Sequence, residues 1–359
     1  MQNNENFFEQ YKKVQQGINS FEIIENADEE DEVDNTIENK NPVINRPEEK
    51  SIEAQSIDFA QDTDDISEAL NALSTSLDVE EMTMELPGIK TNIIIKPLKY
   101  EEEIKLATNR LSTFDFAKQL NSLILKYTQV NDPIIRKEYF KNQNTFEKKI
   151  LATDRSLILF GFLVTSFETL ANTQMECSKC GKTYTADLDT KNLNLKFEED
   201  ITEIDFYNFS YNQSLLNGLI EIEFGINPEW IRLELLKFYD ENMIEKNVEE
   251  KDSLFSILDQ FLLYIKKIKV FKKDKKGKLE LIKTFTTKNK NSLLLTRQFL
   301  HELPFKVKER ISKEIDLEPI NKVVPIFEAL FVCPYCGNID KVPFNPEIEF
   351  FRKALSLSI

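Results

Sequence analysis

Two short stretches, CSKCG at Cys177–Gly181 and CPYCG at Cys333–Gly337, contain all four cysteines of this 359-residue chain. Each stretch has two residues between its cysteines and a glycine directly after the second one. This spacing puts two thiolates on one tight turn, and glycine tolerates the positive φ that completes such a turn. The sequence therefore predicts one tetrahedral four-cysteine zinc site, closed to catalysis, with the ligands Cys177, Cys180, Cys333 and Cys336.

The two cysteine pairs are separated by 152 residues, far more than the roughly 15–20 residues of a usual zinc ribbon. The site is thus predicted to be a split zinc ribbon that clasps distant segments. CPYC also has the form of a glutaredoxin-type redox motif, but such a motif should open a helix, and strand and turn residues follow here. Disulfides are disfavoured because the N-terminus lacks the features of a signal peptide. Redox chemistry and free buried thiols stay open as alternatives.

Working outward from the cysteines, hydrophobic periodicity predicts several helices and a few strands. Residues 157–164 are apolar on every side, which predicts burial between layers. Strands are expected at 91–96 and 219–224, and helices at 100–111, 114–130, 145–169 (with an internal restart near Thr153), from 227 onward, 253–265, 292–302 and 304–315. The fold class predicted from this pattern is α+β with a mainly helical body and small strands.

A lysine-rich stretch at 266–290 contains eleven lysines against only Asp274 and Glu280. The alternation of apolar residues around residues 274–277 predicts a β-hairpin with a short turn. Lysines on both strands suit contact with nucleic acid phosphates, yet they are also the common protection of an exposed sheet edge. An acidic partner protein and the acidic arm of this chain are further candidates for contact with this hairpin.

The net charge of −16 is concentrated at the N-terminus. Residues 1–85 contain 23 acidic and five basic residues, whereas the remainder contains 39 acidic and 41 basic ones. Such a composition predicts a largely disordered acidic arm. Two short stretches of the arm have amphipathic spacing, typical either of transient helices or of docking helices that order on a partner: Phe7, Tyr11, Val14 and Ile18, and Ile66, Leu70, Leu73 and Leu77.

Several classes of protein are excluded or disfavoured by the same sequence. None of the eight glycines forms a dinucleotide- or triphosphate-binding loop. The only histidine, His301, is expected to be a structural residue near a helix C-terminus. The longest apolar run has eight residues, far fewer than the roughly 20 of a membrane span. We therefore expect a protein that is not an enzyme and has no membrane segment.

These features divide the chain into four predicted parts. Residues 1–83 form the acidic arm, and residues 84–190 form an N-terminal helical part that ends in the first zinc knuckle. Residues 191–330 are a folded insertion that carries helices and the lysine-rich hairpin. Residues 331–359 contain the second knuckle and a C-terminal segment.

The order of short motifs along the body resembles a known family. Glu85-Leu-Pro87 precedes an apolar strand and Pro97-Leu98, and the cysteine pairs have characteristic neighbours: Thr153-Asp154-Arg155, Phe160-Gly161, Asp187-Leu188, Pro346 and Phe350-Phe351-Arg352. This arrangement is similar to the baseplate hub and hub-assembly proteins of T-even-like, contractile-tailed bacteriophages, over about Met84 to Ile359 and without the arm. The resemblance implies a structural or assembly protein that binds other tail proteins, in the host cell cytoplasm during assembly or in the virion.

An alternative function is a nucleic-acid-binding zinc-ribbon protein that uses the hairpin at 266–290. The two hypotheses differ in salt dependence, because contact with phosphates weakens steeply as salt rises. A third possibility is that the acidic arm covers the hairpin until a partner arrives.

Overall fold

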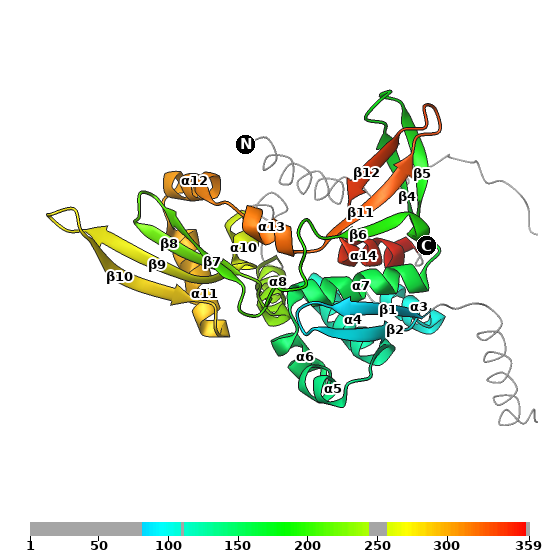
Figure 1. The fold of residues 1–359 in the computed structure, drawn as a ribbon, viewed down its shortest axis with the longest axis horizontal. Helices are drawn as coiled ribbons and strands as arrows, with labels where there is room; N and C mark the ends of the chain where they lie inside the picture. Colours follow the sequence, from blue (N-terminus) through cyan, green and yellow to red (C-terminus); the bar gives the residue numbers. More distant parts are fainter. Residues whose placement is uncertain (1–80, 109–110, 244–256, 357–359) are drawn as a thin grey trace, which may run out of the picture. The chain divides into compact units, whose positions relative to one another are not determined.

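The computed structural model describes residues 81–108, 111–243 and 257–356, which all belong to one compact unit spanning residues 63–359. Most of the acidic arm, including both amphipathic stretches, lies outside the described residues. The described residues form eleven α-helices and four antiparallel sheets (Figure 1). The predicted division into four parts stays a prediction.

The first sheet has the order β1 (Met82–Leu86), β2 (Thr91–Ile95), β3 (Thr128–Val130). Helix α7 (Ala152–Ser166) packs against β1 and β2, and its residues from Leu157 to Leu163 are buried, as their all-round apolar character predicts. Gly161 permits this approach, since a Cβ there would lie 2.2 Å from Ile95 Cδ1. The predicted strand at 91–96 is confirmed as β2.

Four further helices precede α7 in this part of the chain: α3 (Tyr100–Thr108), α4 (Thr113–Tyr127), α5 (Pro133–Tyr139) and α6 (Gln143–Lys149). The helix predicted at 114–130 ends at Tyr127 because the next three residues pair with β2 as strand β3. The helix predicted at 145–169 with an internal restart near Thr153 is two helices, α6 and α7, so the restart is confirmed. The predicted helix breaks at Leu151 because the backbone there bridges to Pro228 instead of continuing the helix.

Two hairpins carry the cysteine pairs. One consists of β4 (Thr169–Glu176) and β5 (Thr183–Asp189), and the other of β11 (Ile326–Val332) and β12 (Ile339–Pro343). A 3-10 turn (Thr190–Asn192) leads from β5 into β6 (Leu193–Lys196), which pairs with β11, so the second hairpin belongs to a sheet of order β12-β11-β6. Figure 1 shows the two hairpins side by side, in agreement with the contact of β5 with β11.

The fourth sheet has the order β10-β9-β8-β7. Its strands are β7 (Ser210–Leu215), β8 (Ile220–Gly225), β9 (Ile265–Lys273) and β10 (Leu279–Thr286). The predicted lysine-rich hairpin is thus confirmed, but its strands extend a larger sheet. The accompanying helices are α8 (Glu229–Met243), α10 (Ile257–Leu262), α11 (Lys290–Glu302), α12 (Phe305–Glu314) and α13 (Glu318–Val323). The helix predicted at 253–265 ends by Leu262, since Ile265 already pairs with β8.

The expectation of a mainly helical body was wrong. The part of the chain that the structure describes is α+β, with 43% of its residues in helices and 29% in strands. The underestimated strands are polar: β4 reads TLANTQME and β7 reads SYNQSL. Such strands bury few large apolar side chains, so their alternation of apolar and polar residues is weak and does not predict a strand.

A buried ion network joins three helices that are distant in sequence. Arg155 of α7 is 2% exposed and Glu229 of α8 is fully buried, and α14 (Pro346–Ser356) contributes Glu347. Arg155 Nε lies 3.1 Å from Glu229 Oε1, and both terminal nitrogens of Arg155 donate to Glu347 at 3.0 Å. Arg232 donates to both glutamates. These four side chains, named here the ion network, pair their charges with one another; Arg155 and Glu229 are fully buried, while Arg232 and Glu347 are 19% and 21% exposed.

Candidate metal centre

The four cysteines lie in the turns of the two hairpins. In the first turn the Gly181 N–H donates to Cys177 O at 2.9 Å, and in the second the Gly337 N–H donates to Cys333 O at 2.9 Å. Gly181 has φ +65° and Gly337 has φ +68°. Both glycines therefore adopt the left-handed conformation that the sequence analysis predicted, and the two turns share one hydrogen-bond pattern.

The hairpins bring the four sulfurs together in what we call the four-cysteine cluster. Cys177 Sγ lies 3.6 Å from Cys336 Sγ, Cys180 Sγ lies 3.7 Å from Cys333 Sγ, and all four lie within 4.8 Å of one another. A disulfide needs sulfurs about 2.0 Å apart, so these cysteines are free thiols. Four thiolates about 2.3 Å from a central ion are separated by about 3.8 Å in a tetrahedron. The donor set and its spacing therefore fit a metal ion.

The electrostatics of the cluster also favour a cation. Burial raises the pKa of the Cys333 thiol, but the N–H groups of Tyr335 and Cys336 donate to its sulfur and lower that pKa to about 7. At Cys336, the Asn338 N–H lowers the pKa, whereas burial and the neighbouring sulfurs outweigh it and raise the pKa to about 12. The Cys333 thiol is thus readily ionised, while the Cys336 thiol resists ionisation beside it. A dication among the sulfurs would relieve this repulsion.

Polar contacts beside the sulfurs connect the two turns directly. Ser178 of the first turn hydrogen-bonds the Asp340 carboxylate of β12, and Asn338 Nδ2 donates to Ser178 Oγ at 3.1 Å. Lys182 Nζ lies 4.7 Å from the centre of the Tyr335 ring, a cation–π contact across the same junction. The two turns therefore meet through side-chain contacts as well as through the sulfurs.

The burial of the cluster points to a structural site. Cys177 and Cys333 are each 1% exposed, while Cys180 and Cys336 lie at the surface. Four thiolates complete a tetrahedral ion and leave no position for water or substrate. A metal ion here would fasten the β4–β5 hairpin to the β11–β12 hairpin.

The histidine lies in a separate cluster, outside the metal centre. His301 Nε2 lies 3.0 Å from both carboxylate oxygens of the buried Asp259, and Arg297 Nε lies 2.7 Å from the same carboxylate. The structure thus gives His301 the satisfied structural contact that its position near a helix C-terminus predicted.

Many lysines of the predicted nucleic-acid hairpin are paired within the protein. Lys266 donates to two backbone carbonyls. Four more form ion pairs: Lys267 with Glu223, Lys269 with Glu221, Lys272 with Glu280, and Lys290 with Glu234. Free ammonium groups are therefore concentrated at the tip of the hairpin. The lysines there that have no ion pair among the described residues are Lys273, Lys275, Lys276 and Lys278.

The ion network was not predicted from the sequence. No charge pattern around Thr153-Asp154-Arg155 or Pro346 links these motifs to Glu229. Arg155 lies 74 positions from Glu229 and 192 positions from Glu347 in the sequence, so no local pattern could predict these two ion pairs.

Within the residues that the structure describes, every helix is too short or too polar to cross a bilayer. Comparisons of the chain with family models, with curated proteins and with solved structures found no match.

Proposed function

We propose that this chain is a structural or assembly component of a contractile phage tail baseplate, in its hub region, and that it acts by binding other tail proteins. The four-cysteine cluster carries this proposal, because a closed thiolate set stabilises a fold and catalyses nothing. The motif order that resembles baseplate hub and hub-assembly proteins supplies the biological setting. The proposed metal is one structural zinc ion, since thiolates in a tetrahedron suit zinc.

An exposed apolar surface beside the four-cysteine cluster supports binding to another protein. Val332, Tyr335 and Ile339 are 62%, 57% and 59% exposed, and Val332 pairs with Ile339 across the hairpin. Three large apolar side chains at the end of one hairpin suit the centre of a protein interface, where aromatic residues dominate the binding energy. The metal would hold this surface in a fixed conformation.

The direct test is the presence of this chain in tail assemblies. Mass spectrometry of purified virions and of baseplate intermediates should detect the chain in a fixed ratio to other tail proteins in at least one of them. Absence from both would contradict the proposal. The matched variants Ile339→Asp and Leu281→Asp, on two different hairpins, should differ: the first should lose association with tail proteins and the second should retain it.

A second candidate function, binding of nucleic acid by the tip of the β9–β10 hairpin, is favoured by the free lysines there. It predicts a mobility shift at low salt that is lost as salt rises. Neutralising Lys273, Lys275 and Lys276 together should abolish that shift. The absence of any shift at low salt would exclude this function.

A further inference from the structure

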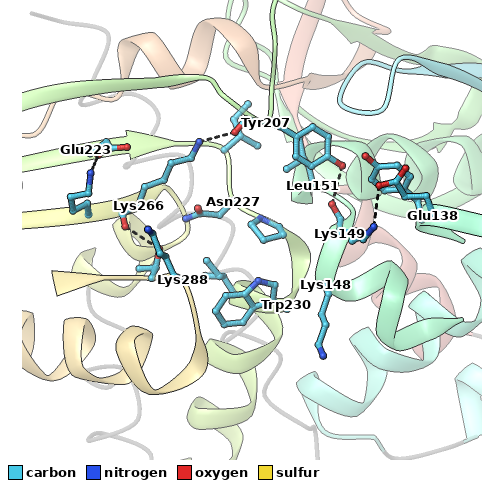
Figure 2. Close-up of a pocket in the computed structure, with 16 residues that line it drawn as sticks. Glu138, Lys148, Lys149, Leu151, Tyr207, Glu223, Asn227, Trp230, Lys266 and Lys288 are labelled. Carbon is cyan, nitrogen blue, oxygen red and sulfur yellow. Dashed lines mark hydrogen bonds and ion pairs between the residues drawn. The ribbon is translucent and has the colours of Figure 1, made fainter. Parts of the chain in front are cut away.

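An open cavity of about 570 Å³ lies between α5, α6 and the start of α8 on one side and the base of the β9–β10 hairpin on the other (Figure 2). Its size is within the range of small-molecule sites, roughly 300–1,000 Å³. The lining includes two glutamates, Glu138 and Glu223, and five lysines: Lys148, Lys149, Lys266, Lys267 and Lys288. The cavity therefore has an excess of positive charge.

The glutamates neutralise only part of this charge. Lys149 Nζ lies 3.0 Å from Glu138 Oε1, and Lys267 pairs with Glu223. Lys148 and Lys288 are exposed and form no ion pair among the described residues. Lys288, which follows β10, thus offers an ammonium group to an anion in the cavity, whereas the end of the Lys148 side chain points away from Lys266 and Lys288 (Figure 2).

Lys266 is the unusual member of the set. Its ammonium donates to Tyr207 O at 3.1 Å and to Phe209 O at 2.8 Å, and the side chain is half-buried. Burial lowers the pKa of Lys266, although Glu223 and Asp205 act in the opposite direction. A partly desolvated ammonium whose hydrogen-bond partners among the described residues are neutral carbonyls is stabilised by a nearby anion.

The backbone is shaped to hold Lys266 in this place. A Cβ at Gly225 would lie 2.4 Å from Lys266 Cε and 2.5 Å from Phe209 O. The absence of a side chain at Gly225 therefore lets the aliphatic part of Lys266 pass over β8 and reach the cavity. The fold thus fixes the position of the Lys266 ammonium, whereas the ammonium groups of the lysines at the hairpin tip have no such contacts among the described residues.

The cavity also contains an aromatic surface. Trp230, the only tryptophan of the chain, lies in the first turn of α8 and is partly exposed. Figure 2 shows Lys266 and Lys288 on one side of the cavity and Tyr207 and Lys149 on the other, with Trp230 and Asn227 between them. An indole face stacks well on flat ring systems.

We propose that this cavity binds a phosphorylated nucleoside, with phosphate oxygens at Lys266 and Lys288 and the base against Trp230. A phosphate group suits this site better than a carboxylate, since it carries about two negative charges and three acceptor oxygens that several ammonium groups share. The nucleotide comes either from the free pool or from an exposed position of a nucleic acid strand. This site is independent of the four-cysteine cluster and of the proposed assembly function.

Because Trp230 is the only tryptophan, its fluorescence reports directly on the cavity. The zinc-loaded full chain is titrated with ATP, tripolyphosphate, adenosine and a single-stranded oligothymidylate of about ten nucleotides. ATP or the oligonucleotide should change the fluorescence saturably, and adenosine and tripolyphosphate should each bind more weakly than ATP. Tighter binding of ATP identifies a free nucleotide as the ligand, and tighter binding of the oligonucleotide identifies a strand.

Lysine variants distinguish binding in the cavity from binding to the rest of the protein surface. Lys288→Ala removes an exposed side chain and should weaken binding by about tenfold, the effect of one lost charged hydrogen bond. Lys276→Ala removes the same charge at the hairpin tip and should leave binding unchanged. Calorimetry with Trp230→Phe should show weaker binding of ATP with unchanged binding of tripolyphosphate. The proposal is overturned if no phosphate probe gives a saturable signal, or if Lys276→Ala weakens binding as much as Lys288→Ala.

Discussion

The four-cysteine cluster and the ion network each join segments that are far apart in sequence, but they differ in what the sequence reveals of them. The cysteine pairs have 152 residues between them, and Arg155 and Glu347 are 192 positions apart. The cysteines are recognisable because each pair has its own local spacing and residue type. The four charged residues are single members of a set of 46 basic and 62 acidic residues. A long-range contact is thus predictable when each of the two segments that form it has a recognisable local sequence pattern.

The four-cysteine cluster and the ion network also differ in how they would stabilise the fold. A metal bound by thiolates contributes folding free energy directly, because the unfolded chain has no formed site. A buried ion network mainly offsets the cost of removing its own charges from water. Burial alone would raise the pKa of Glu347, but the guanidinium groups of Arg155 and Arg232 hold it below its usual value. Loss of the proposed metal or of the ion network should therefore destabilise the protein, and loss of the metal should have the larger effect.

The largest effect is expected from Cys333→Ser. Loss of one ligand should abolish tight metal binding and lower the free energy of unfolding by more than about 4 kcal/mol. Denaturant titration measures this change, and Lys179→Ala in the turn of the other pair is the control, since that side chain is exposed. Equal stability of the Cys333→Ser variant and the control would show that the four-cysteine cluster does not stabilise the fold.

Arg155→Met should be the next most destabilising change. It leaves Glu229 fully buried with one guanidinium partner fewer, and breaking such a pair costs about 3–5 kcal/mol. The double variant Arg155→Met with Glu229→Gln removes one charge of each sign and should recover part of the loss. A single variant as stable as the wild type would mean that Arg155 contributes nothing net to the ion network.

Asp154, the neighbour of Arg155, should make stability depend on pH. Its carboxyl is fully buried and accepts from the Gly88 N–H at 2.9 Å, while Oδ2 has no partner among the described residues. Burial raises the pKa of Asp154 from 3.8 to about 7, although the N–H groups of Gly88 and Ile89 act in the opposite direction. The stabilisation is therefore present below about pH 4 and is lost as the pH rises through about 7.

The variant Asp154→Asn mimics the protonated carboxyl at every pH. Relative to this variant, the wild type should lose about 2–4 kcal/mol of unfolding free energy between about pH 4 and pH 8. Urea denaturation of both proteins across this range measures the difference. Parallel pH profiles would show that the Asp154 carboxyl ionises normally in the folded protein.

The smallest effect is expected for an exposed ion pair. Lys272 Nζ lies 3.1 Å from Glu280 Oε2, and both side chains are more than half exposed. Such pairs contribute less than about 1 kcal/mol. Lys272→Ala should therefore change thermal stability little, and a loss as large as that of Arg155→Met would contradict the distinction between exposed and buried pairs.

Local patterns account for what was predictable in this fold. The CxxCG turns, the strand at β2, the lysine-rich hairpin and the start of α8 each depend on residues within a few positions of one another. The polar strands β4 and β7 were missed because their stability comes from pairing across the sheet. The positive cavity was missed for a similar reason, since α6, α8 and β9 meet there only in the folded chain.

The proposed zinc ion at the four-cysteine cluster is tested most directly by X-ray absorption at the zinc edge. Protein purified without added metal should contain one zinc ion per chain, with four sulfur neighbours at about 2.3 Å. Nitrogen or oxygen neighbours, or fully metal-free protein with intact stability, would contradict the account.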